Sequence, residues 1–448
     1  MKLVLEKKMI VMALVMTLGL PTMEAQNQTL EVNLDKALEI ALSESPTIKI
    51  ADHELVRVDY SKKAAWFGLL PTVDGTAQYG KYLSPATMAL AGMVIDLPTD
   101  WTASVGLQLS LPLVAPALWK SIQMSHLDMQ LAVEKARASK ITLRNDVTKA
   151  YYSILLAQDS YKVLQDGYAL AEENYKQAKK RFEAGVVAEY DCVSAEVQMT
   201  NLQPNLLQVE NGIEQAKLYL KVLMGVEMSV ELLVQGSLAD FENDVFGLNA
   251  NRDIELSNNT DLKQLDIQYL QTKKALGIQQ TQWMPTLAAF GQYTYAGQSD
   301  KEAVSLFNRE AGVQPAHTEW FGQGFIVGLQ LSVPILHVTN YHKDRQLKIQ
   351  AQELQIQRDY AENQLTVAAL TSRDNMNKAT KQMDAAKKAV TLSQKAYEIS
   401  AKRYETGMGT MLELQNAAVA MTQSNLSYQQ AISDYLTAKA DLDKTLGL

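Results

Sequence analysis

The chain is poor in the residues that build catalytic or covalently stabilised sites. Its single cysteine, Cys192, excludes a disulfide within one chain. The five histidines are scattered, and no glycine-rich phosphate loop is present, so no catalytic, cofactor-binding or metal-binding constellation appears. The 42 Lys and Arg are outnumbered by 50 Asp and Glu, which argues against a nucleic-acid-binding surface. The composition therefore predicts a protein that is not an enzyme.

Long apolar runs are also missing. No stretch after residue 25 has eighteen consecutive apolar residues, which excludes helical membrane spans there. Residues 1–25 combine the basic residues Lys2 and Lys7, a short apolar run and a small residue, Ala25, at the end. This pattern predicts a cleaved secretory signal peptide, with an uncleaved anchor as the alternative. If the exported protein crosses a membrane, we expect it to do so by β-strands.

What is present is an internal repeat. VGLQLSLPLV at 105–114 returns as VGLQLSVPIL at 327–336, an offset of 222 residues. RFEAG at 181–185 returns at the same offset as RYETG at 403–407. A chain that repeats itself at half its length is predicted to contain two copies of one structural unit.

Each copy is predicted to contain a strand pair followed by a helical hairpin. Alternating apolar and small polar side chains indicate strands with two different faces. The outgoing helix of each hairpin lacks proline over nearly seventy residues, roughly 100 Å at ~1.5 Å per residue. The predicted strands cover about 72–82, 103–112, 286–297 and 324–333, and the hairpins about 114–225 and 338–446. The repeats are thus assigned to 26–225 and 255–448, with an irregular linker at 226–254.

Two architectures fit such strands. One is a half-buried sheet in a soluble sandwich. The other is the wall of a transmembrane barrel, with apolar side chains toward lipid and polar side chains toward water. Aromatic residues flank both strand pairs, Tyr79 and Trp101 in the first and Tyr295 and Trp320 in the second, which favours the barrel. Four strands cannot close, whereas two copies give eight strands around a filled bore and three give twelve around a passage.

The duplicated strand pairs ending in GLQLS-x-P, together with R-[FY]-E-x-G at the helical turns, resemble the TolC-type outer membrane efflux proteins over about 30–448. The resemblance implies a mixed, mainly α fold. In it, three chains form a 12-stranded transmembrane β-barrel that continues as an α-helical tunnel through the periplasm. It also implies the outer membrane channel of a tripartite efflux or type I secretion system in a Gram-negative cell. The implied partners are a periplasmic adaptor (membrane fusion) protein, an inner-membrane pump and outer membrane lipid, without a cofactor.

The resemblance further implies functional residues at the helical turns. The hairpin tips, with Arg181, Gly185, Arg403 and Gly407, are expected to contact the adaptor. The alternative for each of these residues is that it only ends a helix.

The residues just beyond the turns are expected to form the periplasmic gate. These are Asp191, Glu413 and Asn416, and three Glu413 carboxylates in a trimer form a ring that attracts cations. The alternative for Glu413 is a solvated residue in the first turn of a helix. In some members an arginine pairs with the matching aspartate, but Gly409 occupies that position here, so this latch is not expected.

A second function class competes with the channel. A secreted or surface-anchored helical stalk that adheres to surfaces, without transport activity, also needs long helices. A diffusion porin fits less well, because porins carry many strands in one chain. Heat-stable trimers with single-channel conductance favour the channel, and release without detergent favours the stalk.

Overall fold

The computed structural model describes residues 29–84, 86–90, 93–97, 99–242, 254–300, 303–304, 313–314 and 316–448. The predicted signal peptide at 1–25 lies outside these ranges. The chain divides into two compact units. The first comprises Met1–Lys49, Ser139–Glu255 and Thr366–Leu448, and the second comprises Ile50–Ala138 and Leu256–Leu365.

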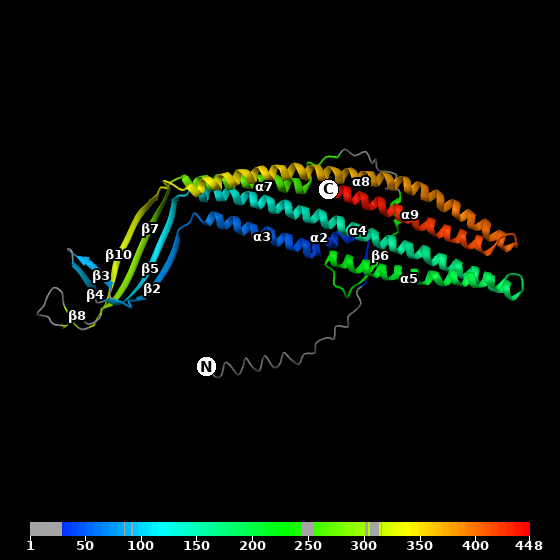
Figure 1. Cartoon of the computed structure of the whole chain (residues 1–448), viewed down its shortest axis with the longest axis horizontal. Coiled ribbons are helices and arrows are strands. Elements are labelled where there is room, and N and C mark those ends of the chain that lie inside the picture. Colours follow the sequence, from blue (N-terminus) through cyan, green and yellow to red (C-terminus); the bar gives the residue numbers. More distant parts are fainter. Residues whose placement is uncertain are drawn as a thin grey trace, which may run out of the picture. The chain divides into compact units, whose positions relative to one another are not determined.

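The described elements follow one another along the chain as shown in Figure 1. In order they are β1 (Thr29–Val32), α2 (Leu34–Glu44), α3 (Pro46–Phe67), β2 (Thr72–Lys81), β3 (Ala86–Leu90), β4 (Met93–Leu97), β5 (Thr99–Val114), α4 (Pro116–Glu183), α5 (Glu189–Met224), β6 (Glu231–Val234), η2 (Leu238–Phe241), α7 (Thr260–Gln280), η3 (Thr281–Trp283), β7 (Thr286–Asp300), β8 (Ala303–Val304), β9 (Val313–Gln314), β10 (His317–Ser332), α8 (Val338–Glu405) and α9 (Met411–Leu446). The protein is mainly helical.

The long helices repeat the offset found in the sequence. α4 and α8 each contain 68 residues, and α5 and α9 each contain 36. All four pairs of matching ends lie 222 residues apart, as from Glu183 to Glu405 (405 − 183 = 222). Both return helices end at a left-handed glycine, Gly225 or Gly447. Proline-free outgoing segments and glycine stops thus specify two equivalent helical hairpins.

The second unit contains a four-stranded antiparallel sheet in the order β10-β7-β5-β2 (Figure 1). The two predicted strand pairs are joined by β5 and β7 into this one sheet. Several residues predicted as loops are strand, because β7 runs on to Asp300 and β10 begins at His317, which faces Asp300. The extension satisfies backbone N–H and C=O groups that a loop would leave to water. A short hairpin, β3–β4, lies between the first two predicted strands.

One face of the sheet is apolar and lies open. On this face Val105, Leu107 and Leu109 are 56%, 58% and 44% exposed, and Val327 and Leu329 are 70% and 67% exposed. The alternating residues on the opposite face include Gln108, Gln292 and Gln330. A soluble sandwich would cover the apolar face. Its exposure therefore marks a surface that needs an apolar environment or partner.

Aromatic rings gather at one end of the apolar face. Trp320 stacks on Tyr295 with ring centroids 5.8 Å apart, and Trp101 lies 6.0 Å from both Trp320 and Tyr79. The Trp320 indole occupies the space above Gly297, where a Cβ atom would come within 2.6 Å of the ring. Gly297 therefore allows the aromatic row to lie flat on the sheet.

The first unit contains the turn-bearing ends of both hairpins and a parallel strand pair. The linker at 226–254, predicted to be irregular, is regular in part, because its β6 pairs in parallel with β1 and η2 follows. The Asp159 carboxylate of α4 accepts hydrogen bonds from Ser237 Oγ and the Leu238 amide at 2.8–3.2 Å, which holds this segment to the helix. Such contacts join residues about eighty positions apart, which no local pattern reveals.

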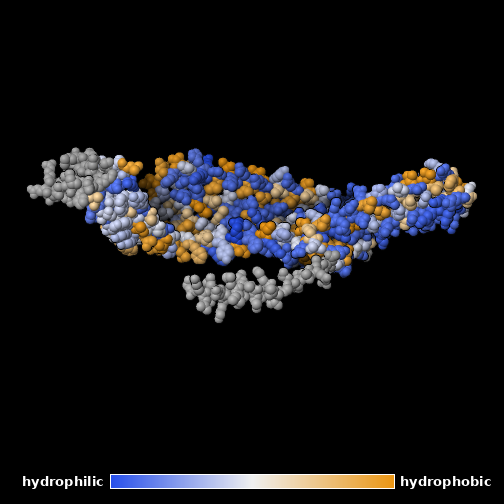
Figure 2. All heavy atoms as spheres, turned by 90° about the horizontal axis from the view of Figure 1, so that it is seen from below, coloured by the Kyte–Doolittle hydropathy of each residue, from blue (hydrophilic) through white to orange (hydrophobic). Residues whose placement is uncertain are grey.

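The helical surface is largely solvated. Figure 2 shows hydrophilic residues over most of the visible helices, with hydrophobic residues scattered among them. Asn33 caps α2 through its side chain, which accepts from the Lys36 amide at 2.9 Å, and Pro46 begins α3. Among the described residues, no helix combines the length and the apolar character needed to cross a membrane.

Replacing Gly297 by alanine is expected to displace the Trp320 indole and to destabilise the sheet by about 1 kcal/mol or more, because the new Cβ overlaps the ring. Tryptophan fluorescence and chemical denaturation of the detergent-purified protein measure both effects. Gly291→Ala is the control, since its Cβ has 3.6 Å to the nearest atom. An emission change that persists in a Trp320→Phe background would contradict this assignment.

Candidate functional site

The two helical turns share one backbone design. Gly185 and Gly407 have φ of +72° and +77°, and no atom would lie within 4 Å of a Cβ at either position. In each turn the next amide closes back on the arginine carbonyl: Val186 N to Arg181 O and Met408 N to Arg403 O, both at 2.8 Å. The glycines are thus required for their left-handed conformation and not for space.

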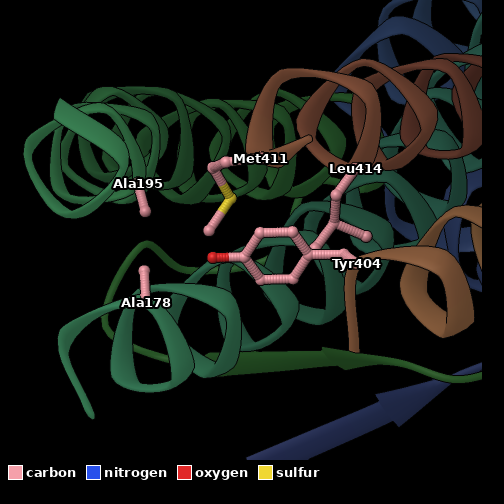
Figure 3. Packing of buried hydrophobic residues seen from close by; sticks show 5 residues of the cluster. All are labelled: Ala178, Ala195, Tyr404, Met411 and Leu414. Atoms are coloured by element: carbon pink, nitrogen blue, oxygen red, sulfur yellow. The ribbon is translucent and has the colours of Figure 1, made fainter. Parts of the chain in front are cut away.

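A small apolar cluster lies immediately inside the turns. It contains Ala178 of α4, Ala195 of α5, Tyr404 of α8, and Met411 and Leu414 of α9. Figure 3 shows the Tyr404 ring lying between these side chains. Because all four helices contribute, this cluster joins the α4–α5 hairpin to the α8–α9 hairpin.

Arg181 adds a polar link between the two hairpins. Its Nη1 donates to the Tyr404 carbonyl at 2.6 Å, and its Nη2 donates to the Glu405 carbonyl. The guanidinium also lies over the Tyr404 ring, 4.9 Å from the centroid. The last carbonyls of a helix carry partial negative charge, so a cation is well placed there. We call this contact between Arg181 and the end of α8 the arginine clamp.

The matching arginine of the second copy behaves differently. Arg403 Nη2 donates to Met408 O within its own turn at 3.2 Å, and its Nη1 lies 3.6 Å from Glu413 Oε2. Both side chains are about half exposed, at 50% and 48%. Glu413 lies in the first turn of α9, where its amide donates to the capping Thr410 Oγ1 at 3.2 Å. Within one chain, therefore, Glu413 is both a first-turn residue and half of a weak surface ion pair.

The other two predicted gate residues lie near the starts of the return helices α5 and α9. Asp191 is in the first turn of α5, and Asn416 is exposed on α9, three residues after Glu413. Burial raises the pKa of the Tyr404 hydroxyl, and the charge of Asp191 raises it further. At Gly409 a Cβ would lie 3.1 Å from Arg403 Cβ and 3.2 Å from the Tyr404 amide, so a side chain there crowds the turn.

Sequence reasoning missed Tyr404. It occupies the same motif position as Phe182, yet Tyr404 is 3% exposed and Phe182 is 41% exposed. The motif R-[FY]-E-x-G marks both positions as aromatic but does not show which ring is covered. Only the packing of α8 against α4 decides that. Within the described ranges, no group of three or more His, Cys, Asp or Glu residues is placed to hold a metal ion.

Removing the arginine clamp is expected to loosen the end of α8. In Arg181→Ala we predict faster hydrogen exchange at the amides of Thr406, Gly407 and Met408, by roughly tenfold if about 1.4 kcal/mol is lost. Arg57→Ala is the control, since Arg57 bonds Glu54 on an exposed helix surface. Unchanged exchange at the turn in Arg181→Ala would show that the apolar cluster alone holds the hairpins together.

Comparison with known proteins connects this architecture to a family. The sequence model described as outer membrane efflux protein matches residues 37–226 and 252–448. Outer membrane protein TolC of Vibrio cholerae serotype O1 is 22% identical over 389 residues, covering 85% of this chain and 82% of that protein.

Solved structures agree in fold. The CmeC outer membrane channel of Campylobacter jejuni matches with a TM-score of 0.72 at 17% identity, over 92% of this chain and 85% of that one. The open state of the MtrE outer membrane channel of Neisseria gonorrhoeae matches with a TM-score of 0.71 at 18% identity, over 92% and 88%. The resemblance that the duplicated motifs indicated is confirmed: the chain belongs to the outer membrane efflux protein family, of the TolC type.

Proposed function

We propose that this protein is the outer membrane channel of a tripartite efflux or type I secretion system. It conducts substrates from an inner-membrane pump and a periplasmic adaptor to the exterior and catalyses no reaction. The observation that carries the proposal is the union, in one member of the outer membrane efflux family, of an open apolar-faced sheet and two matched helical hairpins. In this proposal a cleaved signal peptide at 1–25 directs export, and the mature chain resides in the outer membrane of a Gram-negative cell.

The sheet supports closure by other copies. Its edge strands β2 and β10 contain 10 and 16 residues, and unpaired edges in lipid cost several kcal/mol for each unsatisfied group. In our proposal β10 of one chain pairs with β2 of the next, and three chains give twelve strands. The apolar face then meets lipid, the aromatic row lies at the membrane interface, and the glutamine-bearing face lines the passage.

The matched helices support the rest of the assembly. We propose two repeats, 26–225 and 255–448, because their long helices have equal lengths at one offset. The segment 226–254 between them is an equatorial region that contains β6 and η2. Six hairpins from three chains then form the periplasmic tunnel. This use of long helices favours the channel over an adhesive stalk, since the family comprises efflux proteins.

The turns form the adaptor-facing tips in this proposal. Val186 and Met408, each directly after a turn glycine, are 70% and 69% exposed. Figure 2 shows hydrophobic residues at the surface where these helices turn. Exposed apolar side chains at matching positions of both hairpins suit a protein partner. The contact region comprises the turns around Arg181 and Gly185 and around Arg403 and Gly407.

Glu413, Asn416 and Asp191 form the gate in this proposal. Three Glu413 side chains produce a ring of carboxylates, and within the single chain each lies 3.6 Å from Arg403. Such a ring attracts cations, but the nearby arginines make this attraction weaker than that of three carboxylates alone.

Single-channel recordings in planar bilayers test the conduit and its gate. We expect a small, cation-selective conductance that divalent or trivalent cations block, with at least tenfold weaker block in Glu413→Ala because the carboxylate ring is lost. Glu398→Ala, which removes an exposed carboxylate of α8, is the control. Channels whose block is the same in both variants would leave the conduit standing and remove Glu413 from the gate.

The assembly is tested separately by mass. Detergent-solubilised protein is expected to behave as three chains that resist heating in sodium dodecyl sulfate, because the closed barrel leaves no sheet edge unpaired. Light scattering corrected for detergent gives the number of chains. A single chain that remains soluble without detergent would instead support the adhesive stalk.

A further inference from the structure

The arginine clamp uses only half of a duplicated motif. Arg181 of the first copy binds the carbonyls and ring of Tyr404 and Glu405 in the second copy. The repeat provides the converse set at the same offset: Arg403 in the second copy, with Phe182 and Glu183 in the first. Because the two copies have equivalent sequences at equivalent helix ends, we expect them to make equivalent contacts.

The converse contact is not made within one chain. Phe182 is 41% exposed, whereas its counterpart Tyr404 is 3% exposed. Arg403 is 50% exposed, and its ion pair with Glu413, at 3.6 Å between two half-exposed side chains, is too weak to fix it. Thus the arginine of one copy and the aromatic ring of the other are both left available at the helix ends.

The contact within the chain also has a direction. The observed clamp runs from Arg181 in the first copy to Tyr404 in the second copy. When such a head-to-tail contact repeats around a rotation axis, it closes a ring. After the second copy, the next first copy in that ring belongs to another chain.

We propose that Arg403 clamps the end of α4 in a neighbouring copy of this chain, donating to its Phe182 and Glu183 carbonyls with the guanidinium over the Phe182 ring. The proposal rests on the proposed ring of three chains and names a contact that holds its helical tips together. A second copy is the occupant because the converse half of the motif lies on the same chain type.

The residues around the two contacts predict that the Arg403 contact between chains is weaker than the arginine clamp within the chain. In the cluster inside the chain, Met411 and Leu414 are each 1% exposed. The positions 222 residues earlier hold Glu189 and Cys192. A carboxylate and a thiol replace two large apolar side chains, so less apolar surface is buried around the clamp between chains. We therefore expect the tips to separate between chains before the two hairpins of one chain part.

Cross-linking tests the placement. Ala178 and Leu414 share the cluster inside the chain, and their counterparts are Ser400 and the natural Cys192. In full-length Ser400→Cys, a short bismaleimide should therefore join the introduced thiol of one chain to Cys192 of the next, giving covalent dimers and trimers on denaturing gels. Ser400→Cys combined with Cys192→Ser is the control and should give none.

The outcomes separate this inference from the proposed function. Cross-links confined to single chains, or absent from an intact assembly of three chains with normal conductance, would overturn the Arg403 contact alone. Failure to find any assembly would remove the proposed channel as well.

A mutant cycle tests the chemistry. Arg403→Ala and Phe182→Ala should each slow the cross-link between Ser400→Cys of one chain and Cys192 of the next by about tenfold, and the double variant should slow it no further. Arg403→Lys keeps the charge but loses the two-pronged donor geometry, so it should resemble Arg403→Ala. The cycle at Arg181 and Tyr404 is the matched control. Those two residues contact each other within one chain, so their loss should weaken the packing of that chain's two hairpins. Additive losses at Arg403 and Phe182 would contradict a direct contact.

Discussion

The open edges of the four-stranded sheet are the constraint on which the proposed assembly depends, because unpaired edge groups are costly in lipid. Four strands supply one antiparallel sheet whose apolar face is exposed along β5 and β10. In water such a face would be covered by another layer, and its edges would be blunted or hidden. Among the described residues no layer covers the apolar face, and the edge strands β2 and β10 have no outer neighbour. The open apolar face and edges therefore support the proposed closure by other copies, in a chain that belongs to the outer membrane efflux protein family.

Duplication also supplies each long helix with neighbours to pack against. A 68-residue helix buries too little surface along its length to be stable alone, so it depends on neighbours. The chain supplies two such helices and two 36-residue return helices with equal bounds. Their shared cluster at Ala178, Ala195, Tyr404, Met411 and Leu414 joins the two hairpins at the turns, and the solvated faces remain polar. Packing between like units thus replaces a single thick core.

The two copies have nevertheless diverged where they meet. Equivalent arginines lie at equivalent helix ends, yet Arg181 reaches across to α8 and Arg403 stays within its own turn. The equivalent aromatics are buried in one case and open in the other. Such differences between near-identical sequences arise because each copy has a different neighbour. They fit the proposed assembly, in which the unit is repeated within a chain and again between chains.

Much of this was predictable from local sequence. Proline-free segments, the turn glycines Gly185 and Gly407, and alternating apolar residues determined the helices, the turns and the two-faced strands, because these depend on nearby residues. The full strand lengths, the β1–β6 pairing and the burial of Tyr404 were decided only by tertiary structure. Tyr404 and Arg181 are 223 positions apart, and the carbonyl oxygens that Arg181 binds carry no side-chain signal in the sequence. Contacts between distant backbone groups depend on how whole helices pack, which no local pattern specifies.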